Sequence, residues 1–189
     1  MKKHSICYIT YQTFPADTAN SLQTISNVSY LSRNNCNVSL VFPLREKQST
    51  ESLKELQNFY DFKEDIKIKG FSHNYPFGKT NLFPKIFFHI SHYLWARKIS
   101  KKISISNNFD SFITRSDWVF YFLLKQNKKV TFECHQLSKI RNIILKINLK
   151  NPNAKVIFLN NELRNFFSPI ASENNSIVLH NGVDIIKFK

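Results

Sequence analysis

The chain has 189 residues, of which 42% are hydrophobic and 14% aromatic. This is enough to build the core of one ordinary domain, and it excludes wholesale disorder. With only 3 Gly and 6 Pro, the chain cannot belong to the collagen-like or low-complexity classes. Its 27 basic and 13 acidic residues give a net charge of +14, which favours an anionic partner. The abundance of Lys, Asn, Ile and Phe is also typical of an AT-rich coding sequence, which would raise the charge without any binding function.

The chain opens with a strand, a helix and a second strand. The first predicted strand, 5–11, leads into a helix that Asp17 or Thr18 can cap and that ends near Asn34. Strand 38–42 follows and is expected to end at Pro43. A βαβ unit of this kind builds a parallel sheet through a right-handed crossover.

The same alternation continues along the rest of the chain. The further predicted strands are 66–71, 109–114, 129–134, 155–159 and 176–180. The further predicted helices are 51–59, 82–105, 118–125, 137–149 and 161–167. The sequence therefore predicts one α/β domain over 1–180, doubly wound around a mostly parallel sheet of six or seven strands.

Ligands of such sheets bind beyond the carboxyl ends of the strands, so the residues that follow each strand are candidate site residues. After the first strand, Asn20 and Ser21 lie at a helix N-terminus, where free amides could hold an anion or sugar hydroxyls. Plain helix capping is the alternative for both residues. The loop contains no glycine, so the GxGxxG fingerprint and the P-loop are absent.

Polar and titratable side chains also follow two further predicted strands. Thr114 and Arg115 follow the fourth predicted strand, and Arg115 could bind a phosphate or form a salt bridge to Asp117 or Glu133. Glu133 and His135 follow the fifth strand two positions apart, which places both on one side of an extended chain. This pair could orient His135 against a substrate hydroxyl or perform acid–base work.

Neither a metal nor a cofactor is expected. A metal site would need more ligands than these strand ends offer, since only His180 stands at a comparable position. The three cysteines, Cys7, Cys36 and Cys134, form no CxxC spacing, which favours a reducing compartment over a disulfide framework. Neither a signal peptide nor a membrane span is visible, so we expect a cytoplasmic protein.

The middle of the chain is the most basic part, with 13 basic and 5 acidic residues in 61–130. Within it, helix 82–105 has an apolar stripe that we expect to cover the sheet: Phe83, Phe87, Ile90 and Leu94. Further aromatic residues on the same helix leave peripheral contact with the inner face of the cytoplasmic membrane open: Phe88, Tyr93 and Trp95.

Five short segments occur in the order of a known family: Phe14-Pro15 with Ala19-Asn20-Ser21-Leu22-Gln23, then Asn35-Cys36-Asn37-Val38, Ile113-Thr114-Arg115, Phe132-Glu133-Cys134-His135 and Asn181-Gly182-Val183-Asp184. Together they resemble the N-terminal half of glycosyltransferase family 4, retaining enzymes of the GT-B fold with two facing Rossmann-like domains. The resemblance implies transfer of a sugar from a nucleotide-sugar donor to a cell-envelope glycan or lipid-linked acceptor, without a metal.

The resemblance also implies roles for individual residues. Glu133 and His135 would be the catalytic residues that line the cleft. The substrate-binding residues would be Asn20, Ser21, Thr114 and Arg115. The hinge residues, at the start of an interdomain linker over 181–189, would be Asn181, Gly182 and Asp184.

One departure from the family concerns donor binding. The C-terminal half of such enzymes is marked by two glutamates eight residues apart, and no two glutamates here have that spacing. We therefore expect the chain to be inactive alone, as a fragment, a truncated gene product or half of a split enzyme. A non-enzymatic α/β binding or regulatory module with a vestigial cleft is the alternative. Nucleic-acid binding ranks last because helix-turn-helix, zinc-finger and RNP patterns are missing.

Overall fold

Seven parallel strands form one sheet in the computed structural model, which describes residues 3–75, 83–106 and 109–180. The strand order is β3-β2-β1-β4-β5-β6-β7. The strands are β1 Ser5–Ile9, β2 Asn37–Leu44, β3 Lys67–Ser72, β4 Ser111–Thr114, β5 Val130–Cys134, β6 Ala154–Phe158 and β7 Ser176–Val178. The helices are α1 Ala19–Arg33, α2 Leu53–Tyr60, α3 Pro84–Ser106, α4 Asp117–Leu124, α5 Lys139–Asn148 and α6 Asn161–Phe166. The predicted Rossmann-like α/β fold is confirmed, with every neighbouring pair of strands parallel.

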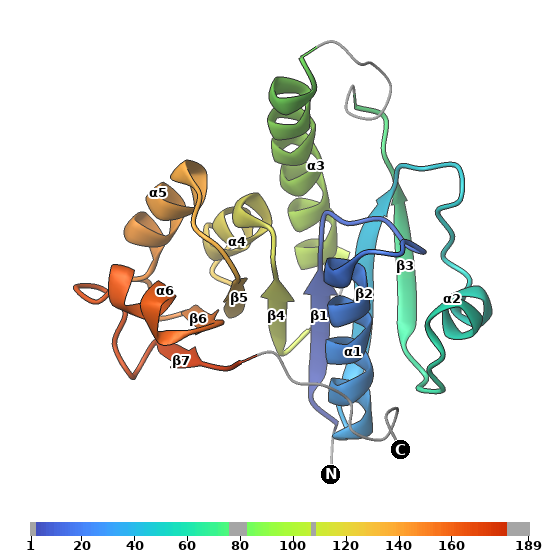
Figure 1. Ribbon diagram of the computed structural model, residues 1–189, viewed down its shortest axis with the longest axis horizontal. Helices are drawn as coiled ribbons and strands as arrows, with labels where there is room; N and C mark the ends of the chain where they lie inside the picture. Colours follow the sequence, from blue (N-terminus) through green and yellow to red (C-terminus); the bar gives the residue numbers. More distant parts are fainter. Residues whose placement is uncertain (1–2, 76–82, 107–108, 181–189) are drawn as a thin grey trace.

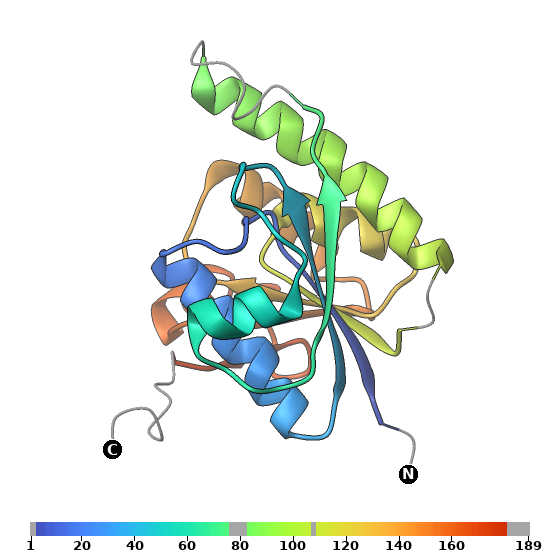
Figure 2. The same ribbon diagram turned by 90° about the vertical axis from the view of Figure 1, so that its right-hand side faces the viewer.

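Helices cover both faces of this sheet (Figures 1 and 2). On one face, α1 and α2 pack through Ile25 and Leu56 against Tyr8 and Leu40 of the central strands. On the other face, α3, α4 and α5 contribute the larger core cluster, in which Trp95 is fully buried. Because neighbouring strand residues point to opposite faces, Glu133 of β5 points to the α1 side. This alternation decides which strand-end residues can meet.

Strand β2 does not end before Pro43, as the sequence predicted, but runs from Asn37 to Leu44. The carbonyl oxygen of Val41 accepts a hydrogen bond from Thr10 N, so Val41 directs its backbone groups to the β1 side. Pro43, two residues later, faces the same side, where β1 has already ended at Ile9. The missing N–H of proline therefore removes no bond from the sheet, and β3 pairs with β2 as far as Leu44.

The orientation predicted for α3 is wrong. The stripe expected to face the sheet is exposed at three of its four residues: Phe83 is 66%, Ile90 45% and Leu94 36% exposed. Trp95, which was expected to point outward, is instead fully buried against the sheet with Ile99. The helix has apolar residues on both faces, so its periodicity alone could not select the buried one.

The loop between β1 and α1 is fixed by two aromatic rings. Phe14 is fully buried against the ring of Phe42, at 4.9 Å between centroids. The Tyr60 hydroxyl accepts a hydrogen bond from Ala16 N and donates one to Ala16 O. Thr18 then caps α1, as predicted, by accepting from Ser21 N. A loop without glycine is thereby held in one conformation at the carboxyl edge of the sheet.

Candidate functional site

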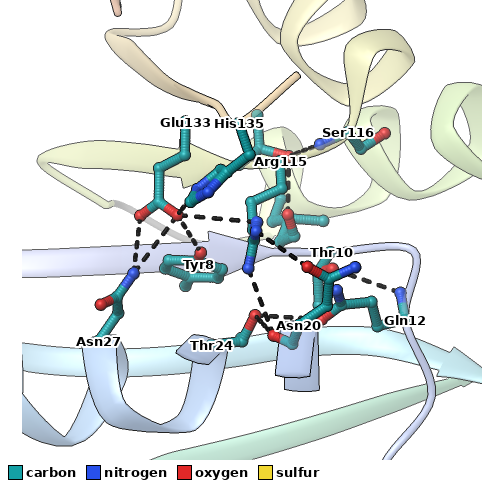
Figure 3. Close-up of polar contacts among 12 residues, drawn as sticks. Tyr8, Thr10, Gln12, Asn20, Thr24, Asn27, Arg115, Ser116, Glu133 and His135 are labelled. Atoms are coloured by element: carbon teal, nitrogen blue, oxygen red, sulfur yellow. Dashed lines mark hydrogen bonds and ion pairs between the residues drawn. The ribbon is translucent and has the colours of Figure 1, made fainter. Parts of the chain in front are cut away.

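Side chains from β1, β5 and α1 meet around one buried carboxylate (Figure 3). Glu133 is 7% exposed. Its Oε2 accepts a hydrogen bond of 2.8 Å from the Tyr8 hydroxyl, and its Oε1 accepts one of 3.2 Å from Asn27 Nδ2. A buried carboxylate needs such donors, because an unpaired charge is costly to keep out of water.

Arg115 joins this carboxylate to the start of α1. Its Nε lies 3.9 Å from Glu133 Oε2, while its terminal nitrogens donate to the backbone oxygen and the Oδ1 of Asn20 at 3.3 and 3.2 Å. The salt bridge considered from the sequence therefore forms with Glu133. Asp117, the other partner considered, instead forms a bidentate ion pair with Arg141, at 2.8 Å between Nε and Oδ1.

His135 completes the cluster. Its Nε2 lies 3.5 Å from Glu133 Oε2, which confirms the predicted placement of both residues on one side of the chain. The side chain of His135 is 21% exposed, compared with 8% for Glu133. His135 can therefore touch a ligand at the carboxyl edge of the sheet, whereas Glu133 lies behind it.

Burial, reinforced by the negative charge of Glu133, raises the pKa of Tyr8 well above its ordinary value. Tyr8 therefore remains a hydrogen-bond donor to Glu133 across the physiological pH range. The carboxylate, held by donors on several sides, is suited to orient His135 and Arg115.

Ser21 and Thr114 do not reach this cluster with their side chains. Ser21 is 1% exposed and its hydroxyl lies 2.8 Å from Thr18 Oγ1 in the cap of α1. The Thr114 hydroxyl donates to Ile9 O and accepts from Ser116 N, which joins β4 to β1. The proposed hinge residues Asn181, Gly182 and Asp184 lie outside the described residues.

Sequence reasoning missed Tyr8 and Asn27. A signal for Asn27 existed, since Asn20, Thr24 and Asn27 are spaced four and three apart and share one face of α1. The Thr24 hydroxyl donates to Asn20 O, within that face. Tyr8 carried no comparable signal, because its partner depends on the order of strands in the sheet.

A cleft of about 380 Å³ opens beside the cluster at the same edge of the sheet, a size that suits a small ligand. Its lining comes from the ends of β1, β4 and β5 and from α3, α4 and α5, and includes Arg115, Trp118, Arg141, Tyr11 and His92. Another hollow, of about 440 Å³, lies at the amino ends of β1 and β2. The carboxyl edge is the candidate ligand site, because parallel α/β sheets bind ligands there and because the polar cluster converges there.

Inside this cleft, the ring of His92 stacks on that of Tyr11 at 4.2 Å between centroids, and its Nε2 lies 2.6 Å from Ser116 Oγ. Burial, with smaller contributions from nearby charges led by His89, lowers the pKa of His92 to about 3. His92 is therefore neutral at physiological pH and helps to fix the loop after β4.

Within the described part of the chain, no group of three or more His, Cys, Asp or Glu side chains could hold a metal ion. None of the helices described there is long and apolar enough to cross a membrane.

No family model matches the sequence, and no curated protein matches it. Two solved structures are similar in fold. A glycosyltransferase from Rickettsia africae ESF-5 shares 17% identity at a TM-score of 0.55, over 100% of this chain and 46% of the other. LpCGTa in complex with UDP shares 9% identity at a TM-score of 0.57, over 96% of this chain and 53% of the other. The chain thus spans about half the length of each, and the similarity establishes a shared α/β fold.

Proposed function

We propose that this chain is the N-terminal, acceptor-side domain of a retaining, GT-B-type glycosyltransferase similar to family 4. One observation supports this most strongly: His135, Glu133, Arg115 and Asn20 converge at the carboxyl edge of a sheet whose fold matches half of a glycosyltransferase. The acceptor would be a cell-envelope glycan or a lipid-linked sugar, bound at the cytoplasmic side of a membrane.

In this proposal His135 is the catalytic residue that touches the sugar, because it is the more exposed member of the Glu133 pair. Glu133 orients it: a carboxylate beside a histidine fixes the ring and favours one tautomer. Arg115 and Asn20, which bond to each other, would bind hydroxyl or phosphate oxygens of the substrates. Thr114 and Ser21 would act through the backbone positions that they fix.

The donor would be a nucleotide sugar, a class consistent with the UDP held by LpCGTa. Both similar structures are about twice as long as the part that matches, which leaves room for a second domain. We propose that this second domain, beginning after a hinge at Asn181, Gly182 and Asp184, holds most of the donor. The 189 residues alone would then bind acceptor without turnover.

The test is binding of sugars to the isolated chain, measured by saturation-transfer NMR against glycan fragments, lipid-linked sugars and nucleotide sugars. We expect at least one glycan or lipid-linked sugar to bind, and His135→Ala to weaken it about tenfold or more, a typical effect of losing a contact to a charged or polar group. Lys54→Ala, on the exposed outer side of α2, is the matched control and should bind as the unchanged chain does.

Two outcomes would contradict the proposal. Binding of no sugar in the panel, or binding insensitive to His135→Ala and Arg115→Ala, would remove the acceptor site from this edge. Clear transfer from a nucleotide sugar by the chain alone would show that the donor needs no second domain.

A further inference from the structure

We propose that the first half of α3 docks this protein on the surface of an anionic lipid bilayer. The docking surface, called here the α3 outer face, comprises four exposed apolar residues: Phe83, Ile86, Ile90 and Leu94. This inference goes beyond glycosyl transfer and does not depend on it.

Three of these residues form one stripe on α3, and Phe83 directly precedes the helix. The spacing of four positions between Ile86, Ile90 and Leu94 places them on the same side of the helix. Phe83 is 66%, Ile86 57%, Ile90 45% and Leu94 36% exposed. Single exposed apolar residues are ordinary on a protein surface, but a row of three large ones, with an exposed phenylalanine just before it, marks an interaction site.

The sheet cannot cover this stripe, because the opposite side of the same helix packs against the sheet. Trp95, Ile99 and Ile103 are buried in the core beneath α3, each at most 1% exposed. The helix therefore has two apolar sides, and only one of them packs against the described core. The other side needs a partner from outside the described fold.

The charge around the stripe identifies that partner. Lys85 lies beside the stripe, and Arg97, Lys98 and Lys101 follow it along the helix, all exposed. The sequence from 83 to 106 contains no acidic residue, and none of these four cations forms an ion pair among the residues that the structure describes. Apolar side chains flanked only by cations suit the acyl boundary and phosphate headgroups of an anionic leaflet.

The shape of the molecule permits this contact. Figures 1 and 2 show the first turns of α3 extending past the carboxyl ends of the strands and clear of the rest of the fold. Among the residues that the structure describes, nothing in these views stands between the start of the helix and a bilayer surface. Its inner side, at Phe88, His89 and His92, lines the cleft beside Arg115, so docking would bring that cleft next to the lipid headgroups.

The experiment is co-sedimentation of the whole chain with two kinds of vesicle. One kind is pure phosphatidylcholine, and the other contains equal parts of phosphatidylcholine and phosphatidylglycerol. We expect binding to the anionic vesicles in low salt, weaker binding in high salt, and little binding to phosphatidylcholine alone. Equal binding to both kinds of vesicle, or binding to neither, would overturn the proposal.

Paired substitutions separate the contribution of the α3 apolar residues to vesicle binding from nonspecific hydrophobic adsorption. Ile86→Ser with Ile90→Ser should lower the partition constant about tenfold or more, because two inserted side chains are lost. The matched control is Ile143→Ser with Ile147→Ser on α5, which removes two isoleucines that are at least as exposed and lie beside lysines of another helix. An equal loss from the control would contradict docking through α3.

A second pair tests the electrostatic contribution. Arg97→Gln with Lys101→Gln should abolish most of the salt dependence, whereas Lys54→Gln with Lys63→Gln, exposed elsewhere, should preserve it. Circular dichroism verifies that each variant is folded. Salt dependence that survives the first pair unchanged would contradict an electrostatic role for α3.

Light scattering without lipid tests the competing occupant, a second copy of the chain. A dimer that becomes monomeric in the Ile86 and Ile90 double variant would overturn the proposal. His135→Ala should bind vesicles as the unchanged chain does, so a failure of the proposed transferase site and a failure of docking give different results.

Discussion

Tyr8 and Glu133 share a buried hydrogen bond of 2.8 Å although strand β4 lies between their strands in the sheet. The tyrosine ring spans β4 and brings a donor from the first strand to a carboxylate near the end of β5. This bond and the hydrogen bond from Asn27 hold the carboxylate of Glu133 in place, and His135 and Arg115 lie beside that carboxylate. The strand ends are therefore coupled through side chains as well as through the backbone.

Tyr8→Phe should lower the free energy of unfolding by about 1 to 3 kcal/mol, because the aromatic ring remains while a buried carboxylate loses a donor. Urea unfolding monitored by circular dichroism measures this loss. Tyr30→Phe, at a position 66% exposed, is the control and should change stability by less than about 0.5 kcal/mol. Equal stability of both variants would show that the Tyr8 hydroxyl does not support Glu133.

Removing the cap of α1 should affect both stability and the site. Thr18→Ala deletes the side chain that accepts from Ser21 N and should lower the free energy of unfolding by about 1 kcal/mol. Ser52→Ala removes the equivalent cap of α2 and should cost a similar amount. Only Thr18→Ala should also weaken ligand binding at the site proposed around Asn20, which lies in the first turn of α1. Equal effects of both variants on binding would contradict a site at that helix start.

His92 should make the protein less stable as the pH falls. The folded-state pKa of about 3 lies below the ordinary value of 6.5, so between these values the unfolded chain takes up a proton that the native chain does not. This loss of stability is absent above pH 6.5, grows as the pH falls, and reaches its full size below pH about 3. At pH 5 it amounts to about 2 kcal/mol.

His92→Gln should therefore flatten the pH dependence of stability between neutral and mildly acidic buffer. The measurement is the urea midpoint at pH values on both sides of the ordinary histidine pKa, compared with His89→Gln, whose side chain is exposed on the same helix. If the two variants lose the same amount of stability on acidification, His92 does not titrate as its burial requires.

The three thiols should differ in reactivity. Burial raises the pKa of Cys134 to about 11 and raises that of Cys7 further, and both thiols are buried, whereas Cys36 is partly exposed. We expect Ellman's reagent to modify Cys36 quickly and the other two only as the protein unfolds. Cys36→Ser should abolish the fast phase. Rapid reaction of Cys134 would contradict its position inside the core.

Local patterns in the sequence were sufficient for contacts within one element or its cap. The two-residue spacing of Glu133 and His135 correctly placed both on one side of β5, and Thr18 was correctly expected among the caps of α1. The bond between Asn20 and Arg115 joins residues 95 positions apart. Their contact follows from β1 and β4 being neighbours in the sheet, which no local pattern determines.

Two errors had the same physical origin. The period of α3 correctly indicated a helix, but apolar residues on both sides left its rotation undetermined, and packing of Trp95 against the sheet decided it. Pro43 is ordinarily a strand terminator, but here it lies where the neighbouring strand has already ended. In both cases the decisive partner lies elsewhere in the chain.

The bonds from Tyr60 to both backbone groups of Ala16 have a thermodynamic consequence for binding. A loop that is ordered before a ligand arrives loses little conformational entropy when the ligand binds, so the affinity of the site proposed at Asn20 would reflect the contacts themselves. Tyr60→Phe would release the loop while leaving every ligand contact in place. Calorimetry should then show a similar binding enthalpy with a more unfavourable entropy, which would identify α2 as a remote determinant of affinity at the start of α1.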